Sequence, residues 1–511
     1  MECDQIKNLR PWVVNHHPFN ILLKISQEIG AEVFLIGGLV RDRLLGRETR
    51  DVDLTLSQEA LKAARLFAEQ TGGTFVLLRE EGEMARVVIN GQSFDFSKLR
   101  GPDLEADLKA RDFTINAICL PLAQAFAPGE WLPYDPLNGI RDLENRLLRM
   151  TDPDCFQQDP LRILRAFRLS AQLGLTIDSD TRQAIKKWGP VLTRSAPERI
   201  HYEWLLLLSQ PAGFVSLLEM EEAGLLEVLF PEIGLLRGIR QDRYHHLDVF
   251  QHSLLTFQFL EKLIQRSCPA EGRDTMKYEN KAGRRLNLEP YFRTKRHFPL
   301  PADLEAEMFS FLNPDWKPAW LKWAALVHDL GKAVTGNERK GQQTFYGHPE
   351  ASQGQFDSIA QRYRIGNREK TFIQKMIGGH MRPLLLVQEE VRGHLTRRAL
   401  NRFVREASDE LSGFFLLALA DSLAAQGPEK PQDLEDRIMN LWRQALLIRD
   451  EWISPPAKVP ALVSGRDLIE LGLKPGPLFK TLLSEIKEEQ MEGRIPSREE
   501  ALDWIKNRLG L

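Results

Sequence analysis

The sequence contains no run of eighteen apolar residues, the shortest stretch that predicts a membrane-spanning helix. Its four cysteines form neither a CxxC pair nor a disulfide framework, which suits a reducing compartment. The first residues, MECDQIKNLRPW, are polar and mixed in charge, unlike a secretory signal. These absences predict a cytoplasmic protein that has no membrane partner.

The chain also lacks a large excess of charge of either sign. Its formal net charge is −3, so the protein as a whole is not a basic nucleic-acid binder. Basic stripes nevertheless occur, and a stripe is enough to contact phosphates. Solvated helix faces explain any one of them equally well. The stripes are RDLENRLLRM (141–150), LRILRAFR (161–168), RRLNLEPYFRTKRH (284–297) and RGHLTRRALNRFVR (392–405).

The length of 511 residues predicts several domains. Residues 17–150 alternate short β-like runs with helix-like pieces, which predicts an α/β or α+β domain. The β-like runs are AEVFLIGG, DVDLTL, TFVLLRE, ARVVING and QSFDFSKL. From 151 to 244 the pattern is helical, and no strand is expected beyond residue 155.

The rest of the chain is also predicted to be helical. A third region is expected over 245–452, and it contains a polar, turn-rich insertion at about 266–317. The segment SPPAKVP indicates a linker, and a small helical tail is expected over 453–511.

The stretch FLIGGLVRDRLLGRETRDVDLTLS (34–57) carries the first group of candidate functional residues. Gly37 and Gly38 follow an apolar run and permit a turn whose free N–H groups suit a phosphate. Asp51 and Asp53 lie two apart on a predicted strand and therefore share a face. Asp95, in the strand-like SFDFSKL, offers a third carboxylate. Three carboxylates around two Mg²⁺ ions can activate a hydroxyl and stabilise a leaving pyrophosphate.

The same stretch resembles the signature of the class II tRNA nucleotidyltransferase and bacterial poly(A) polymerase family. Four further segments resemble motifs of that family in the same order, with Ala110 in place of an Arg and Gln158 in place of a Glu. The four segments are DLKARDFTINAI (107–118), DPLNGIRDLENRLLR (135–149), QDPLRILRAFR (158–168) and PERIHYEW (197–204).

The resemblance implies a nucleotidyltransferase head with a mixed sheet, followed by a helical neck that binds the nucleotide base and RNA. Asp51, Asp53 and Asp95 are expected to hold the two Mg²⁺ ions that assist attack of an RNA 3′-hydroxyl on the α-phosphate. Further motif positions are expected to bind the triphosphate and ribose or to brace the site. They are Gly37, Gly38, Arg41, Asp42, Arg111, Asp112, Asn116 and Arg165.

Asp159 and Arg162 fall on the neck pattern with which the family reads the incoming base. A carboxylate accepts from the exocyclic amino group of C or A, and a guanidinium donates to the ring nitrogen. U and G present the reverse pattern. At i and i+3 on a helix, the two side chains are expected to share a face. Taken alone, the pair is more typical of a helix-start carboxylate with an ordinary surface Arg. Within the long motif, base recognition is the favoured interpretation.

A second group of candidate residues lies in the helical half of the chain. It consists of histidines and aspartates with ligand chemistry for a borderline transition metal. The pattern resembles the HD domain of metal-dependent phosphohydrolases, which implies either hydrolysis of phosphoesters or a role in holding RNA. The candidate ligands are His252, His328, Asp329, His348, His380 and Asp421.

The sequence therefore favours a tRNA nucleotidyltransferase that builds or repairs the 3′-terminal CCA of tRNA from CTP and ATP. Within the same fold, A addition, CC addition and poly(A) synthesis remain open alternatives. A different class of protein is an HD phosphohydrolase whose front half only senses a nucleotide. The intact Asp51 and Asp53 pair argues against that class, because sensing requires no metal pair.

Overall fold

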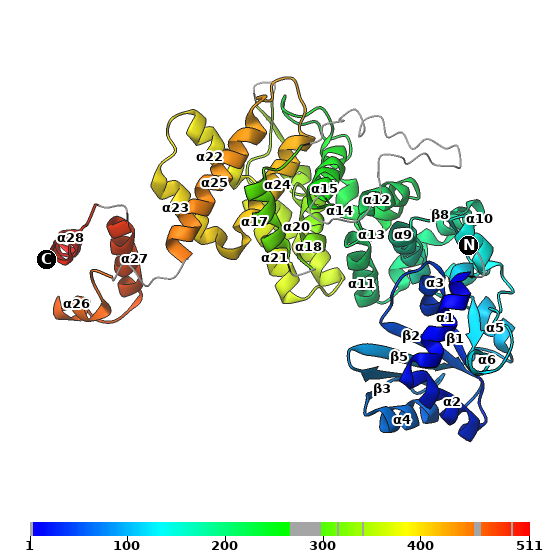
Figure 1. The fold of residues 1–511 in the computed structure, drawn as a ribbon. Coiled ribbons are helices and arrows are strands. Elements are labelled where there is room, and N and C mark those ends of the chain that lie inside the picture. The colour runs from blue at the N-terminus through cyan, green and yellow to red at the C-terminus, as the bar shows by residue number, and fades with distance from the viewer. Residues whose placement is uncertain are drawn as a thin grey trace. The chain divides into compact units, whose positions relative to one another are not determined.

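A computed structural model describes residues 4–265, 298–313, 316–339, 342–453, 461–491 and 494–510. Within these residues, no helix is long and apolar enough to cross a membrane. The chain divides into two compact units (Figure 1). The first comprises Met1–His394 and Asp409–Met439, and the second comprises Leu395–Ser408 and Asn440–Leu511. The predicted domain boundaries within the first unit stay predictions.

A six-stranded mixed sheet forms the head, in the order β3-β4-β5-β2-β1-β6. Only β2 and β5 pair in parallel; the other neighbours are antiparallel. Five strands match the β-like runs of the sequence, and β6 is additional. The bounds are β1 Val33–Ile36, β2 Asp51–Leu56, β3 Thr74–Arg79, β4 Met84–Ile89, β5 Gln92–Lys98 and β6 Cys119–Pro121.

The two faces of this sheet differ in chemistry because side chains alternate along each strand. Val52 and Leu54 on β2 and Phe94 on β5 are buried on one face, which α2 (His17–Ile29) and α4 (Ala60–Thr71) cover. The rings of Phe67 on α4 and Phe94 lie 5.0 Å apart. The opposite face carries the acidic side chains, so the apolar layer fixes the sheet that positions the candidate site.

The head also contains α1 (Asp4–Asn15), α3 (Gly38–Leu44), α5 (Leu104–Lys109), a 3₁₀ turn at Thr114–Asn116, α6 (Leu122–Phe126) and α7 (Gly139–Glu144). Gly139 lies against this 3₁₀ turn. A Cβ at Gly139 would stand 2.2 Å from the Thr114 carbonyl oxygen, so only glycine fits there. This contact holds the 107–118 segment against α7.

The neck is helical, as predicted. Its helices are α8 (Cys155–Gln158), α9 (Leu161–Leu173), α10 (Ser179–Trp188), α11 (Pro197–Leu208), α12 (Gly213–Glu222), α13 (Leu225–Leu229) and α14 (Pro231–Gly234). The expectation of no strand beyond residue 155 was wrong. Thr176–Ile177 (β8) pairs with Leu147–Leu148 (β7), and β9 (Asn337–Arg339) pairs with β10 (Gln342–Thr344). Strands of two or three residues are too short to show a period of two.

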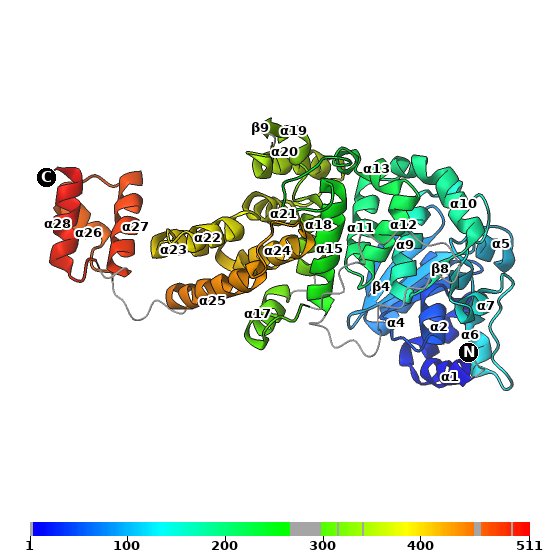
Figure 2. The ribbon, with the colours of Figure 1, turned by 90° about the horizontal axis from the view of Figure 1, so that it is seen from above.

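Helix α24 (Leu411–Ala424) is buried along its whole length and lies in the middle of the remaining helices of the first unit (Figure 2). Helices α15 (Val249–Gln265) and α18 (Lys317–Val327) pack on it. The other helices here are α17 (Ala302–Leu312), α19 (Lys332–Thr335), α20 (His348–Arg362), α21 (Asn367–Gly379) and α22 (Arg382–Val391).

The prediction of a turn-rich insertion at 266–317 was wrong for its last part. Residues 266–297 lie outside the described residues, but 302–312 form α17. Leu304, Met308 and Phe311 of α17 are buried. Their spacing of four and three residues is helical, and α17 packs on α24.

The second unit contains α23 (Arg397–Ala407) and three short helices, α26 (Gly465–Glu470), α27 (Pro477–Met491) and α28 (Arg498–Leu509). One helix, α25 (Leu434–Ile453), belongs to both units, because the first unit ends at Met439 within it. The three short helices bury an apolar core that includes Leu468, Leu482 and Ile505. The predicted fold class, a mixed-sheet head followed by helical regions and a helical tail, is confirmed.

Candidate active site

Three charged residues form a row across the open face of the head sheet. Asp53 on β2 pairs in register with Asp95 on β5, and Asp95 pairs in register with Arg86 on β4. The Arg86 guanidinium binds Asp95 through two hydrogen bonds, from Nε to Oδ1 at 2.6 Å and from Nη2 to Oδ2 at 2.7 Å. Asp51, two residues before Asp53, is exposed on the same face. The three predicted carboxylates are therefore brought together.

The predicted glycine turn lies directly against Asp53. The Gly38 N–H donates to Asp53 Oδ2 at 3.1 Å. Gly37 has φ +71°, a conformation that L residues rarely adopt, and a Cβ there would stand 3.2 Å from Asp53 Oδ2 and 3.3 Å from Arg111 Nη1. The turn therefore places a backbone N–H, a carboxylate and a guanidinium around one point.

Burial raises the pKa of Asp53 above its ordinary value, and the negative charge of Asp95 adds to this effect. The Arg111 and Arg41 charges and the Gly38 N–H act in the opposite direction but do not cancel it. A carboxylate in this position gains from a divalent cation, because the cation replaces the proton that burial favours.

The predicted residue Arg111 is held in place by two other side chains. Its guanidinium donates to Asp107 Oδ2 at 3.0 Å and to Thr55 Oγ1 at 3.1 Å. Asp107 is buried and lies one helical turn before Arg111, so the pair is an i, i+4 ion pair. Thr55 is the next residue after Asp53 on the same face of β2.

A chain of buried polar contacts connects the head to the neck. Arg41 donates to Asp42 Oδ1 at 2.8 Å and to Asn116 Oδ1 at 2.7 Å, and Asn116 donates to Asp112 Oδ1 at 2.9 Å. Asp112 Oδ2 then accepts from Arg165 on α9 at 3.0 Å. These five predicted residues brace the site, and within the described part of the chain none of them forms a hydrogen bond or an ion pair with the Asp53 carboxylate.

Arg165 continues this network to α11. Its Nε donates to Glu203 Oε1 at 3.1 Å, and Arg168 donates to Glu203 Oε2 at 2.6 Å. Burial alone would raise the pKa of Asp112, but the Arg165 charge and the Asn116 amide outweigh it and hold that pKa below its ordinary value. Asp112 therefore stays ionised as an anchor for Arg165.

The expectation that Asp159 and Arg162 share one helix face was wrong. Asp159 follows α8 with extended backbone, and α9 begins at Leu161. The Arg162 guanidinium donates to the carbonyl oxygens of Ala110 at 2.9 Å and Arg111 at 3.2 Å. The Asp159 carboxylate instead accepts from Arg199 on α11 at 2.9 Å. Pro160 after Asp159 explains the break, because the residue before a proline avoids helical backbone.

A pocket of about 240 Å³ opens beside Asp159. It is lined by Leu161, Arg165, Glu198, Arg199, Tyr202 and Glu203. The wall of the pocket therefore contains Arg199, which pairs with Asp159, and Arg165, which joins Asp112 to Glu203. It also contains the exposed ring of Tyr202. Arg199, Tyr202 and Glu203 lie in the PERIHYEW segment.

The second group of predicted residues converges inside the helical half of the first unit. His252 lies on α15, His328 and Asp329 follow α18, and the others come from separate helices. His252 Nε2 lies 2.8 Å from Asp421 Oδ1, and His328 Nε2 lies 3.1 Å from Asp329 Oδ2. His348 on α20 and His380 after α21 bring their Nε2 atoms 3.4 Å and 3.8 Å from Asp329 Oδ1. All six predicted ligands are therefore brought together.

Three of these imidazoles have the same orientation. The Nδ1 atoms of His328, His348 and His380 lie 2.8, 2.8 and 2.6 Å from backbone carbonyl oxygens three residues earlier. A carbonyl only accepts, so each Nδ1 carries a proton, and each Nε2 is turned toward Asp329. His348 Nε2 and His380 Nε2 face each other at 3.2 Å. This is the arrangement expected of metal ligands.

Burial alone would lower the pKa of His328, but the Asp329 charge outweighs it and raises that pKa above its ordinary value. Burial lowers the pKa of His252 to about 4 and that of His380 to about 3, so both rings are neutral near pH 7. Burial alone would raise the pKa of Asp329, but His328 and Lys332 outweigh it and hold that pKa well below its ordinary value. Among the described residues, Asp329 Oδ1 has no hydrogen-bond partner.

Comparison with known proteins identifies the family. The family described as "Poly A polymerase head domain" matches residues 33–149, and "Probable RNA and SrmB- binding site of polymerase A" matches 174–236. An A-adding tRNA nucleotidyltransferase of Deinococcus radiodurans is 29% identical, with 92% of this chain and 94% of the relative covered. A CC-adding tRNA nucleotidyltransferase of Thermus thermophilus is 30% identical, with 93% of each chain covered.

The chain belongs to the class II tRNA nucleotidyltransferase family. The fold agrees. A solved structure described as the complex of a CCA-adding enzyme with ATP superposes with a TM-score of 0.60 at 20% identity and covers 98% of this chain and 96% of that one. The sequence resemblance of the head is confirmed. The HD resemblance of the helical half stays a prediction.

Several residues of this nucleotidyltransferase site were not predicted from the sequence. Asp107 could have been found, because it lies four residues before Arg111 in the same motif segment, a spacing that allows an ion pair on a helix. Arg86 could not, because its place beside Asp95 depends on strand register, which a strand pattern alone does not specify. Arg199 is reached only through the packing of α9 against α11.

Arg86 would compete with any metal ion that Asp95 binds, because its guanidinium holds both oxygens of that carboxylate. We expect that replacing Arg86 with Gln will lower the Mn²⁺ dissociation constant of the head site by about threefold to tenfold. Both side chains are partly exposed, so the lost repulsion is screened to about 1 kcal/mol. Titration by electron paramagnetic resonance measures the free ion. Arg86→Lys keeps the positive charge but loses the bidentate contact with Asp95, so it should change the Mn²⁺ dissociation constant less than Arg86→Gln does. Weaker binding in Arg86→Gln would show that Arg86 organises the site instead.

Proposed function

We propose that this enzyme adds C and A to the 3′ end of tRNA in the cytoplasm, using CTP and ATP. The oxygen of the RNA 3′-hydroxyl attacks the α-phosphorus, and the bond to pyrophosphate breaks. Two Mg²⁺ ions bound by Asp51, Asp53 and Asp95 would polarise the α-phosphate and favour the ionised 3′-hydroxyl. The observation that carries the proposal is the pairing of Asp53 with Asp95 in register, against the Gly38 N–H.

The other residues bind and orient the nucleotide. The glycine turn offers N–H groups at the start of α3, and Arg111 adds a positive charge beside them, so a triphosphate is favoured there. Arg41, Asn116 and Asp112 keep that turn in place through buried hydrogen bonds. A site braced in this way needs little reorganisation during the reaction.

Base choice is assigned to Asp159 and Arg162, as the family pattern implies. Each of these side chains already has a protein partner, so a base must replace or share those contacts. Arg199 exchanges its contact with Asp159 at little cost, because this ion pair is exposed. The Asp159 carboxylate is then available to the amino group of C or A.

Replacing Asp159 with Ala should reduce the preference for CTP and ATP over UTP and GTP by about 5-fold to 150-fold, which corresponds to about 1–3 kcal/mol for a pair of base contacts. The measurement is the ratio of kcat/KM values for the four nucleotides. Arg199→Ala removes the ion-pair partner of Asp159 but leaves the Asp159 carboxylate itself. This variant should therefore keep the preference for CTP and ATP over UTP and GTP. An unchanged ratio in Asp159→Ala would assign base choice to other residues.

Primer extension tests the proposal. Three tRNA substrates, ending at the discriminator base, after C and after CC, are each incubated with CTP or ATP alone. The proposal expects C on the first two substrates and A on the third. Extension only of the CC-ended substrate would indicate A addition, and addition of C without any extension of the CC-ended substrate by ATP would indicate CC addition. Long homopolymers would indicate poly(A) synthesis. Relatives at 29% and 30% identity carry the first two activities in their names, so identity alone does not choose.

A second activity is proposed for the helical half: metal-dependent hydrolysis of phosphoesters. The supporting observation is the set of inward-facing Nε2 atoms around the unpartnered Asp329 oxygen. The donors fit a borderline divalent ion such as Mn²⁺, Co²⁺ or Ni²⁺, which would supply a nucleophilic water. Hydrolysis of bis-p-nitrophenyl phosphate by the metal-loaded protein should disappear in His328→Ala/Asp329→Ala. A protein that binds metal but hydrolyses nothing would leave RNA holding as the role.

A further inference from the structure

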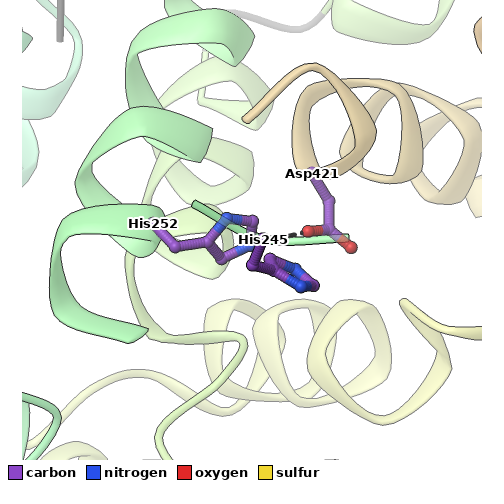
Figure 3. A group of neighbouring side chains, drawn as sticks. All are labelled: His245, His252 and Asp421. Atoms are coloured by element: carbon purple, nitrogen blue, oxygen red, sulfur yellow. Dashed lines mark hydrogen bonds and ion pairs between the residues drawn. The ribbon is translucent and has the colours of Figure 1, made fainter. Parts of the chain in front are cut away.

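A seventh side chain, which was not among the predicted ligands, joins the second cluster. His245 lies in the loop between α14 and α15, seven residues before His252. The rings of His245 and His252 meet edge to face with centroids 4.6 Å apart. One donor atom each from His245, His252 and Asp421 fit within 4.8 Å of one another (Figure 3). This spacing suits three ligands of one ion.

The His245 ring has a partner on Nδ1, as the rings of His328, His348 and His380 do. Its Nδ1 lies 2.6 Å from Asp242 Oδ1, and the backbone N–H of Tyr244 donates to the same oxygen at 3.0 Å. A carboxylate on Nδ1 leaves the Nε2 lone pair for a metal and makes the ring a better ligand. His245 therefore has the outer partner that metal-bound histidines usually have.

The loop that carries His245 is tied to both segments that carry other ligands. On one side, Lys332 Nζ contacts Asp329 Oδ2 at 2.7 Å and donates to Gln241 in the loop at 2.7 Å. On the other side, Gly427, shortly after the Asp421 helix, donates to the Tyr244 carbonyl at 2.6 Å.

Position 427 accepts only glycine here, because a Cβ would stand 2.1 Å from the Arg243 carbonyl oxygen. The Arg243 side chain adds an ion pair with Glu429 at 2.5 Å. The close backbone contact brings the loop against the end of α24. It therefore fixes His245 on the side of the cluster where His252 and Asp421 lie.

A further atom in this part of the cluster is unpartnered. His252 is fully buried, and its Nδ1 has no hydrogen-bond partner among the described residues. A buried polar atom without a partner is costly unless an ion or water satisfies it. This unpartnered atom belongs to the ring that His245 contacts, so an ion bound here would lie close to both imidazoles.

We propose that His245 is a ligand of the metal centre, together with His252 and Asp421, and that the 235–248 loop supplies it. This inference rests on the metal centre proposed above for the helical half. The ion is a borderline divalent cation, because two imidazoles and one carboxylate are its donors. One ligand of the centre then comes from a loop and not from a helix. The contact of Gly427 with that loop helps to hold this ligand in place.

Co²⁺ binding to the full-length protein tests the inference without relying on activity. The protein is stripped with a chelator and titrated with Co²⁺, while the visible absorption reports the ligand set. Replacing His245 with Ala should raise the Co²⁺ dissociation constant at least about tenfold and change the band shape. The matched control is His246→Ala, which removes the exposed neighbouring imidazole and should leave both unchanged. Added imidazole should restore the band in His245→Gly.

The outcomes separate the two proposals. If the wild-type protein binds no Co²⁺, the metal centre itself is wrong. If the wild type binds but His245→Ala gives the same affinity and spectrum, only the assignment of His245 is overturned. Nucleotide incorporation by the head serves as the folding control, and it should be equal in wild type and His245→Ala.

Discussion

Replacing Asp53 with Asn should lower the single-turnover rate of nucleotide incorporation at least about a hundredfold to a thousandfold. The change keeps the size of the side chain and an acceptor for the Gly38 N–H, but it removes the charge that would bind the metal ions. Rapid-quench measurement at saturating CTP and Mg²⁺ gives the rate of the chemical step.

Ser97→Ala is the matched control. Ser97 lies two residues after Asp95 on the same face of β5 and bonds to Thr55, but it carries no charge. Its rate should stay within a few fold of wild type. A rate for Asp53→Asn close to that of Ser97→Ala would contradict a metal-binding role for Asp53.

Replacing Lys322 with Met should destabilise the first unit by about 3–5 kcal/mol. Lys322 is buried on α18 and contacts Glu261 on α15 at 2.8 Å. It also donates to the carbonyl oxygen of Leu208, the last residue of α11, at 3.0 Å and to that of Gln210, two residues later, at 2.9 Å. Its loss leaves a buried carboxylate and two carbonyls without their cation. Urea unfolding followed by circular dichroism measures the free energy of unfolding.

Two variants bracket this result. Lys322→Met/Glu261→Leu removes both charges and should recover most of the loss. Lys109→Met breaks the exposed pair with Glu105 and should cost no more than about 1 kcal/mol. A loss for Lys322→Met as small as that for Lys109→Met would show that the buried pair does not hold the neck on the helices behind it.

The loss should depend on pH. Burial raises the pKa of Glu261 above its ordinary value of 4.5 even with Lys322 present. Without Lys322 that pKa rises further, so the folded variant takes up a proton that the unfolded chain does not hold. The defect should therefore be largest at alkaline pH and shrink as pH falls from the raised pKa toward 4.5. A defect that is equal at pH 5 and pH 8 would exclude an ionised Glu261.

The strands and the glycine turn of the head could be predicted because they depend on residues that are close together in the sequence. The strands around Asp53 and Asp95 follow from short apolar runs, and the glycine turn follows from two adjacent glycines. Their order along the chain also carried the family resemblance, which the comparisons confirm. Register is not local, and therefore the Arg86 contact with Asp95 could be known only from the folded sheet.

The neck shows a second limit of sequence reasoning. A helical spacing was assumed from Asp159 to Arg162, but Pro160 breaks the helix between them, and each side chain finds a partner on a different element. Arg199, which contacts Asp159, and Glu203, which contacts Arg165, both come from a helix some forty residues away in sequence. Such contacts depend on helix packing, which no spacing rule predicts.

In the helical half, the order of His and Asp residues along the sequence predicted six residues that the structure brings together. His245 was missed because it lies in a loop beside another histidine, and nothing local distinguishes the two. Only the Asp242 contact and the tether at Gly427 show which of them faces the cluster.

The central claim is that the head, and not the helical half, transfers nucleotides to tRNA. Its most direct test compares incorporation of labelled CMP and AMP by wild type, Asp51→Ala/Asp53→Ala and His328→Ala/Asp329→Ala on one tRNA preparation. We expect labelled tRNA with wild type and with the His328 and Asp329 variant, and none with the Asp51 and Asp53 variant. Incorporation that survives loss of Asp51 and Asp53 would contradict it.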